Sequence, residues 1–309
     1  MKTSRLCLFH RISLGRACAV FVVFAIASAG LFASESIVRV AMSDGIELET
    51  VVVLPDGEGP WPVVMERTPY NCRKAVVKNL DLAKRGYVAV AQNIRGTGKS
   101  AGTWTGFGND GWGGPGFRDG VDTVAWLRAQ SWCNGRIGLF GGSASGIAAQ
   151  LLVAAAPEGL ACAYVNAASD NLYETMFPGG CYRTNTVDTW PNAEPLRPEI
   201  RRHPMYDDYW RARDARSRSD VADVPVYVTG VWFDLFQRST VSYFKVQNTN
   251  WLPRSDGHCK LFVYPGAHGA PPGQLEYPDR ANQSADAAIG SMMEWYDYWL
   301  KDADNGILL

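Results

Sequence analysis

The chain has 309 residues, of which 47% are hydrophobic and 20% are charged, and its formal net charge is -1. This composition is typical of globular proteins and excludes disordered, collagen-like and low-complexity chains. A nearly neutral chain also lacks the basic surface of nucleic-acid-binding domains, so we expect no nucleic-acid partner. The length suits one large α/β domain or two small ones.

The first 33 residues have the pattern of an export signal. A basic start (Lys2, Arg5, Arg11 and Arg16) precedes an uncharged run over 17–32 that ends in small residues. This order is typical of secretory signal peptides, and the run falls just short of the roughly 20 residues that span a membrane. We therefore expect a mature domain over 34–309 that is secreted or periplasmic, without stable membrane association. An uncleaved leader would instead anchor it.

Beyond the leader, short apolar runs alternate with helical patterns. Runs rich in Val, Ile, Leu and aromatic residues predict eight strands, at Ile37–Met42, Glu47–Leu54, Pro62–Glu66, Tyr87–Gln92, Arg136–Phe140, Leu160–Asn166, Val224–Thr229 and Cys259–Val263. Helices are predicted at Val77–Arg85, Asp119–Ala129, Ile147–Ala156 and Ser284–Leu300. The alternation predicts an α/β fold with a mostly parallel sheet and helices on both faces.

One segment, about 170–222, interrupts this alternation. It is rich in Pro, Gly, Trp and Arg, and we predict that it forms a small helical cap inserted over the sheet edge. Its arginines between Arg197 and Arg218 are expected to form a solvated helix face, because charge runs usually do. A subsite for an acidic substrate group is the alternative.

Familiar cofactor patterns are absent or incomplete. Gly106–Gly111 fits G-x-G-x-x-G, but the residues after it cannot start the helix that binds a pyrophosphate. Residues 95–100 end like a P-loop, yet Asn93 occupies the place of its first glycine. No C-x-x-C or H-E-x-x-H occurs, so we expect no cofactor and no metal. The five cysteines beyond the leader allow one or two disulfides, and Cys162 is predicted to be a buried thiol.

The strongest chemical signal is a serine between a predicted strand and a predicted helix. Ser143 stands in Gly141-Gly142-Ser143-Ala144-Ser145-Gly146, after the strand at Arg136–Phe140. The layout is typical of a nucleophile elbow, whose sharp turn lifts the serine Oγ above the sheet. The N–H of Ala144 would then face an oxyanion. This spacing differs from the usual G-x-S-x-G. The assignment of Ser143 as a nucleophile therefore depends on whether the sequence also offers a suitable acid and base.

An acid and a base follow in the order that α/β-hydrolases use. Asp234 follows the strand predicted at Val224–Thr229, and His268 follows the one at Cys259–Val263. Sites in parallel sheets lie at the carboxyl ends of strands, and the hydrolase order is Ser, Asp, His. An aspartate after a strand is usually a turn former and a lone histidine is usually structural. All three in order predict a catalytic triad.

Several motifs give the chain a resemblance to the serine hydrolase family of cocaine esterase and the Xaa-Pro dipeptidyl-peptidases. They are Arg67-Thr68-Pro69-Tyr70, Gln92-Asn93-Ile94-Arg95-Gly96, Asp119-Gly120-Val121-Asp122, Trp126-Leu127, Trp132-Cys133-Asn134-Gly135, Trp232-Phe233-Asp234 and Trp295-Tyr296-Asp297-Tyr298-Trp299-Leu300. The resemblance covers about Val38 to Gly306 and implies an α/β-hydrolase fold, with a serine motif of the form G-x-S-x-x-G.

The resemblance also implies a role for each site residue. Ser143 would be the nucleophile, His268 the general base and Asp234 the residue that orients it. The Tyr70 hydroxyl and the Ala144 N–H would form the oxyanion hole. Without the resemblance, Tyr70 reads as an exposed turn residue after Pro69.

Three departures from the family pattern shape the expected function. Ala144 replaces a usual tyrosine. Leu235-Phe236-Gln237 follow Asp234, whereas members specialised for amino-acid esters carry extra acidic residues near this aspartate to hold an amino group. The sequence ends about where a C-terminal jelly-roll domain would begin, so we expect that domain to be lacking. We expect an exported serine hydrolase that cleaves ester or amide bonds of small substrates, with esters preferred. A Xaa-Pro dipeptidyl-peptidase-like peptidase and a truncated, non-catalytic binding protein are the alternatives.

Overall fold

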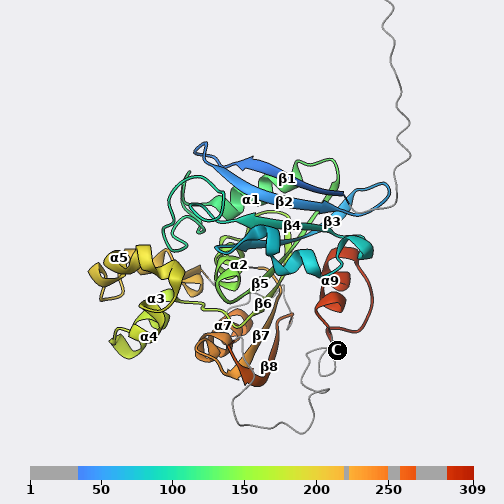
Figure 1. Cartoon of the computed structure of the whole chain (residues 1–309). Coiled ribbons are helices and arrows are strands. Elements are labelled where there is room, and N and C mark those ends of the chain that lie inside the picture. Colours follow the sequence, from blue (N-terminus) through green and yellow to red (C-terminus); the bar gives the residue numbers. More distant parts are fainter. Residues whose placement is uncertain (1–33, 219–222, 250–257, 269–290) are drawn as a thin grey trace, which may run out of the picture. The chain divides into compact units, whose positions relative to one another are not determined.

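The computed structural model describes residues 34–218, 223–249, 258–268 and 291–309. The leader predicted over 1–33 lies outside the described residues. An eight-stranded sheet organises the described part, in the order β1-β2-β4-β3-β5-β6-β7-β8 (Figure 1). The strands are β1 (Ser34–Ala41), β2 (Glu47–Leu54), β3 (Trp61–Thr68), β4 (Val88–Asn93), β5 (Cys133–Gly142), β6 (Leu160–Asn166), β7 (Val226–Phe233) and β8 (Lys260–Ala267).

The strands from β4 to β8 form the parallel part of the sheet. β1 pairs antiparallel with β2, and β2 with β4, whereas β3 lies parallel between β4 and β5, and β6, β7 and β8 continue in parallel. Each predicted strand is present, and β2 and β6 have the predicted bounds. The mostly parallel sheet is confirmed, and the fold is that of the α/β-hydrolases.

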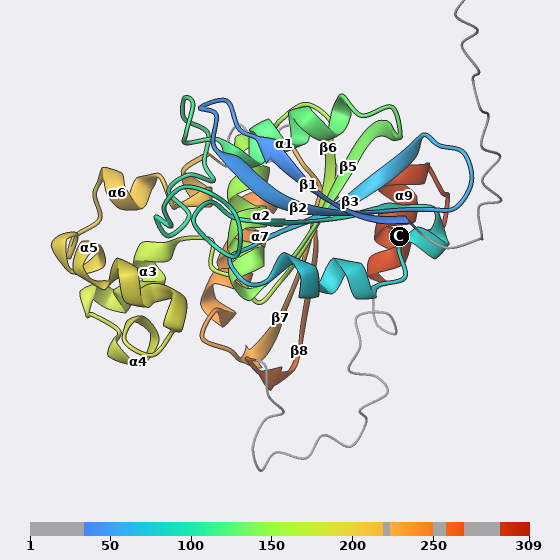
Figure 2. The same cartoon turned by 45° about the horizontal axis from the view of Figure 1, so that its top comes forward.

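Helices cover both faces of the sheet, as predicted. α1 (Asp119–Arg128), α2 (Ser143–Ala155) and α7 (Gln237–Thr249) pack with one set of strand side chains, including Val63 and Met65 of β3. α9 (Met292–Lys301) packs with the other set, including Val64, on the opposite side of the sheet (Figure 2). Successive strand residues point to opposite faces, so one strand supplies both cores.

Two hydrogen bonds fasten α9 to the strands beneath it. Trp295 Nε1 donates to the Ala163 carbonyl at 3.1 Å, and the Tyr296 hydroxyl donates to the Leu139 carbonyl at 2.8 Å. Both side chains are fully buried, so these bonds satisfy polar atoms that would otherwise lack water. The motif Trp295–Leu300 therefore has a structural role.

The predicted helices need two corrections. Val77–Arg85 is not one helix but two short 3-10 helices, η2 (Val76–Asn79) and η3 (Ala83–Arg85). Asp81 lies between them with a φ of 50°, and an α-helix cannot continue through a left-handed residue. The helix predicted from Ser284 begins at Met292, where Ser291 and Glu294 form a capping box, and 284–290 lie outside the described residues.

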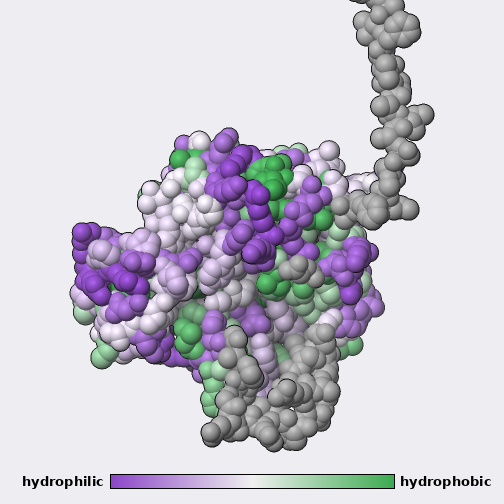
Figure 3. All heavy atoms as spheres, viewed as in Figure 1, coloured by the Kyte–Doolittle hydropathy of each residue, from purple (hydrophilic) through white to green (hydrophobic). Residues whose placement is uncertain are grey.

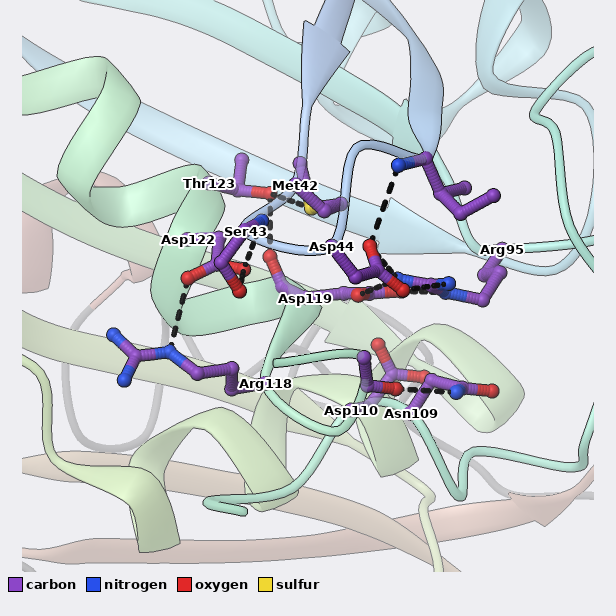
Figure 4. A network of polar contacts seen from close by, with 12 residues as sticks. Met42, Ser43, Asp44, Arg95, Asn109, Asp110, Arg118, Asp119, Asp122 and Thr123 are labelled. Atoms are coloured by element: carbon purple, nitrogen blue, oxygen red, sulfur yellow. Dashed lines mark hydrogen bonds and ion pairs between the residues drawn. The ribbon is translucent and has the colours of Figure 1, made fainter. Parts of the chain in front are cut away.

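A polar network centred on the buried Arg95 and Asp119 holds the loop that follows β4 (Figure 4). The Arg95 guanidinium donates to Asp44 in the β1–β2 turn at 2.6 and 3.0 Å and to Asp119 at the start of α1 at 2.7 and 2.9 Å. Asp122 accepts from Arg118 and from the N–H and hydroxyl of Ser43. These contacts assign structural roles to the motifs around Arg95 and Asp119.

Between β6 and β7 the described residues form a cap, which projects to one side of the sheet (Figures 1 and 2). Its elements are α3 (Leu172–Met176), η4 (Pro178–Gly180), α4 (Thr184–Val187), η5 (Pro191–Leu196), α5 (Arg197–Arg202), α6 (Asp208–Arg211) and η6 (Ala215–Arg218). Much of its outer surface is hydrophilic (Figure 3), and Arg201, Arg202 and Arg211 are exposed there.

The prediction that the whole arginine set is solvated is wrong for Arg213. Its side chain is buried and its guanidinium lies 3.7 Å from the centroid of the Tyr209 ring. It donates to the carbonyls of Thr105, Gly106 and Tyr209 at 2.6 to 2.8 Å. Carbonyl acceptors and an aromatic face replace the lost water, which makes the burial tolerable.

The cysteines that the structure describes are all free. Each of the five beyond the leader falls within the described residues, and none forms a disulfide, so the allowance for one or two disulfides is not met. Cys162 is fully buried, as predicted, and burial raises the pKa of its thiol. No helix in the described ranges combines the length and the apolar character that crossing a membrane requires.

Candidate active site

The backbone turns sharply at Ser143, between the end of β5 and the first turn of α2. Ser143 has a φ of 52°, in the left-handed region that residues with side chains rarely adopt. A Cβ added at Gly141 would lie 2.5 Å from the Ser145 carbonyl oxygen, and one at Gly146 would lie 2.6 Å from the Ala168 Cβ. Both glycines of the G-x-S-x-x-G string are therefore required by close packing around the elbow.

Three residues that are distant in the sequence meet at the carboxyl ends of β5, β7 and β8. Ser143 Oγ lies 2.9 Å from His268 Nε2, and His268 Nδ1 lies 2.7 Å from Asp234 Oδ2. Asp234 directly follows β7 and its side chain is fully buried, whereas His268 directly follows β8 and is partly exposed. The structure thus brings the three residues of the predicted triad into one hydrogen-bonded chain.

The second oxygen of Asp234 is also engaged. Asp234 Oδ1 accepts the backbone N–H of Phe236 at 2.7 Å, so the carboxylate is held at both oxygens. The Phe236 ring packs edge-on against the His268 imidazole, with centroids 5.3 Å apart. These two contacts fix the orientation of the carboxylate and of the ring that it faces.

A buried carboxyl is hydrogen-bonded to the first turn of α2, next to the elbow. Glu66, in β3, accepts the Ser145 hydroxyl at 3.0 Å and the Val77 N–H at 3.0 Å. Burial raises the pKa of Glu66, and the two hydrogen bonds oppose that rise. No motif of the sequence pointed to Glu66. Its only signal was a charged residue at the end of an otherwise apolar predicted strand.

Tyr70 lies two residues after β3, and its side chain is 45% exposed. Its N–H donates to Thr68 Oγ1 at 3.2 Å, which closes a tight turn. The residue is exposed, as the simple interpretation expected, yet it lines the same cavity as Ser143 and Ala144. The structure therefore places both residues predicted to supply oxyanion donors in the lining of the cavity that contains the serine.

This cavity lies between the cap and the carboxyl ends of the strands and has a volume of about 340 Å³. The core contributes Tyr70, Ser143, Ala144, Ile147, Leu235, Phe236 and His268. The cap contributes Leu172, Thr175, Met176, Asn185, Thr186, Thr189, Trp190 and Pro191. The described lining includes no carboxylate, lysine or arginine. Such walls suit an apolar, uncharged group of a small ligand.

The described residues contain no group of three or more His, Cys, Asp or Glu side chains placed to hold a metal ion.

The glycine-rich loop that contains Gly106 contacts the cap. A Cβ at Gly106 would lie 2.7 Å from Leu196 Cδ1, so the glycine makes room for a side chain of the cap.

An elbow serine facing a histidine and a buried aspartate, at the carboxyl edge of this sheet, defines the site of an α/β-hydrolase. The family model for the X-Pro dipeptidyl-peptidases (S15 family) matches the chain over residues 44–197 and 191–270. The chain belongs to this family of hydrolases.

Known relatives agree in sequence and in fold. Cocaine esterase from Rhodococcus sp. (strain MB1 Bresler) is 30% identical over 169 residues, which are 52% of this chain and 28% of the esterase. An aminopeptidase from a marine sediment Thaumarchaeota archaeon superposes with a TM-score of 0.69 at 20% identity, covering 88% of this chain and 55% of that one. An α-amino acid ester hydrolase gives 0.62 at 18% identity, covering 92% and 58%. The chain thus spans little more than half the length of these two structures.

Proposed function

We propose that the chain is an exported serine hydrolase that cleaves ester or amide bonds of small substrates through an acyl-enzyme. The contacts from Ser143 through His268 to Asp234, at the floor of an apolar cavity, carry this proposal. The base lies within hydrogen-bond distance of both the nucleophile and the orienting acid, as such catalysis requires.

The proposal assigns a group to each step of the reaction. Ser143 Oγ attacks the substrate carbonyl carbon while His268 Nε2 takes the hydroxyl proton, and the buried carboxylate of Asp234 stabilises the imidazolium that forms. The Ala144 N–H and the Tyr70 hydroxyl stabilise the oxyanion. His268 then protonates the leaving alcohol or amine, and the acyl-enzyme remains. Water attacks the acyl-enzyme with His268 again as the base, which releases the acid and frees Ser143.

The chemistry of the cavity favours esters with an uncharged acyl group. A peptidase that removes an N-terminal dipeptide must desolvate an ammonium group, which is costly without a carboxylate partner. The described lining offers none. Nearby carboxylates of the cap are already engaged, Glu174 with Arg216 and Asp188 with Arg201. The family match keeps Xaa-Pro dipeptides as the second candidate substrate.

Labelling and turnover test the proposal together. A fluorophosphonate should label Ser143, and wild-type protein should hydrolyse p-nitrophenyl butyrate. Ser143→Ala should abolish both, whereas Ser36→Ala, on the exposed part of β1, should change neither. Folded wild-type protein that is neither labelled nor active would contradict catalysis and favour a binding protein. Faster release from a Xaa-Pro p-nitroanilide than from the ester would favour the dipeptidyl-peptidase.

Export is tested separately. Expression of the full chain in a Gram-negative host should place the mature protein in the periplasm, with an N-terminus near residue 34 by mass spectrometry. An intact leader in the membrane fraction would favour the anchored form instead.

A further inference from the structure

The segment that carries Tyr70 is held by side-chain amides from two directions. From the sheet, the fully buried Asn93 at the end of β4 donates through Nδ2 to the Tyr70 carbonyl and, at 3.4 Å, to the Thr68 carbonyl. From the cap, Asn192 Nδ2 donates to the Pro69 carbonyl at 3.2 Å. Three successive carbonyls therefore accept side-chain amides.

The contact from Asn192 has a direct geometric consequence for Tyr70. The Pro69 carbonyl and the Tyr70 N–H belong to one peptide unit, which is planar. Thr68 Oγ1 holds the N–H end of this unit and Asn192 holds the carbonyl end. Both ends of the plane that leads into the Tyr70 Cα are thereby fixed. Since the Tyr70 side chain is 45% exposed, burial does little to place it, and these backbone anchors matter more.

Asn192 is itself fixed within the cap. It lies in η5, and its own carbonyl accepts Trp104 Nε1 at 2.8 Å. The same short helix buries Leu196 against the glycine-rich loop at Gly106. Trp190 and Pro191, which immediately precede Asn192, line the substrate cavity. One short segment therefore contacts the cavity, the glycine-rich loop and the backbone of the oxyanion segment.

We propose that Asn192 is a positioning residue, through which the cap sets the place of the Tyr70 hydroxyl in the oxyanion hole. This inference rests on the proposed function and on the role of Tyr70 in it. Asn192 is not among the described residues that line the cavity, so it acts on the transition state through Tyr70 and not on substrate binding. Its loss should lower kcat and leave KM nearly unchanged.

A double-mutant cycle on p-nitrophenyl butyrate hydrolysis tests this role. Asn192→Ala should lower kcat about 10-fold, because misplacements of about 1 Å can cost up to about 100-fold. Tyr70→Phe should lower it by on the order of 10²–10³. The double variant should be no slower than Tyr70→Phe alone, because Asn192 acts only through the hydroxyl. Asn192→Asp, which keeps the shape but cannot donate, should resemble Asn192→Ala.

The matched control is Asn305→Ala, which removes an amide-to-carbonyl bond of the same kind, Asn305 Nδ2 to the Glu294 carbonyl at 2.8 Å, in the C-terminal segment. It should leave kcat unchanged. Titration of Ser143 with a fluorophosphonate gives the concentration of competent sites, so loss through misfolding is separated from loss of rate. Full activity of Asn192→Ala, a change confined to KM, or a further 10-fold loss in the double variant would overturn the proposal. Inactive wild-type protein would instead overturn the proposed function.

Discussion

Replacement of Asp234 by asparagine tests how the proposed triad is oriented. Asp234 is fully buried and uses both oxygens, Oδ2 towards His268 Nδ1 at 2.7 Å and Oδ1 towards the Phe236 N–H at 2.7 Å. Of the two ends of an asparagine amide, only the carbonyl oxygen can accept the Phe236 N–H. An asparagine at this position must therefore turn its carbonyl to Phe236 and its NH2 to His268.

That orientation places the proton on the wrong nitrogen of the ring. An NH2 group only donates, so His268 Nδ1 has to accept, and the ring proton moves to Nε2. Nε2 then has no lone pair for the Ser143 hydroxyl, which lies 2.9 Å away. The same substitution in a serine-protease triad lowers kcat about 10⁴-fold, which corresponds to about 5.5 kcal/mol of transition-state stabilisation. We expect a loss of that order in Asp234→Asn.

Asp234→Ala and Asp234→Asn both remove the carboxylate charge, but only Asp234→Asn forces the wrong tautomer of His268. Comparison of the two variants therefore separates the effect of the tautomer from the effect of the lost charge. Asp234→Ala lets water bind His268 Nδ1 in either role, so its kcat on p-nitrophenyl butyrate should exceed that of Asp234→Asn. Asp56→Asn, in the exposed β2–β3 loop, is the matched control and should keep full activity. An Asp234→Asn variant within 10-fold of wild type, or one faster than Asp234→Ala, would refute this reasoning.

Two further predictions concern stability. Arg67 and Asp110 form a buried ion pair. Arg67→Met and Asp110→Leu should each lower the free energy of urea unfolding by about 3–5 kcal/mol, because each leaves a buried charge without its partner. The double variant should lose clearly less than the sum of the two, and additive losses would contradict the pairing. Burial raises the pKa of Asp170 from 3.8 to about 6, while Arg216, 3.5 Å away, opposes the rise. The pKa of Asp170 is higher in the folded state than in the unfolded state. The contribution of the protonated Asp170 to folding stability is therefore full below pH 3.8 and is lost as the pH rises through 6. Relative to Asp170→Asn, wild-type stability should fall over that range by on the order of 3 kcal/mol, and a difference independent of pH would count against it.

The strands were predictable because a buried strand has a recognisable apolar pattern in its own residues. A strand covered on both faces reads as a continuous apolar run, and β2 and β6 have the bounds that such runs predict. The three triad residues were found for a related reason, since each lies within five residues of the end of such a run. The elbow added a second local signal, two glycines where the packing around Ser143 leaves no room for a Cβ.

One helix and two buried charged residues had no such local pattern and were not predicted. The helix α7 was missed because its buried side combines Tyr243 with polar residues, Ser239, Thr240 and Gln247, so the apolar period is weak. Arg213 was assigned to solvent because an arginine gives no local sign that carbonyls from a loop 107 residues away will surround it. Glu66 was missed for the same reason, since its partner Ser145 lies 79 residues further along.

The sequence by itself determined the order of the strands, the elbow at Ser143 and the identity of the residues that follow β7 and β8, because each depends on short-range periodicity or on turn chemistry. Only the tertiary structure decided that Ser143 and His268, 125 residues apart, lie within hydrogen-bond distance, and that Asn192 reaches the segment of Tyr70. Such contacts depend on which strands become neighbours and on how the cap packs against the sheet. Both are set by burial summed over the whole domain, which no local pattern contains.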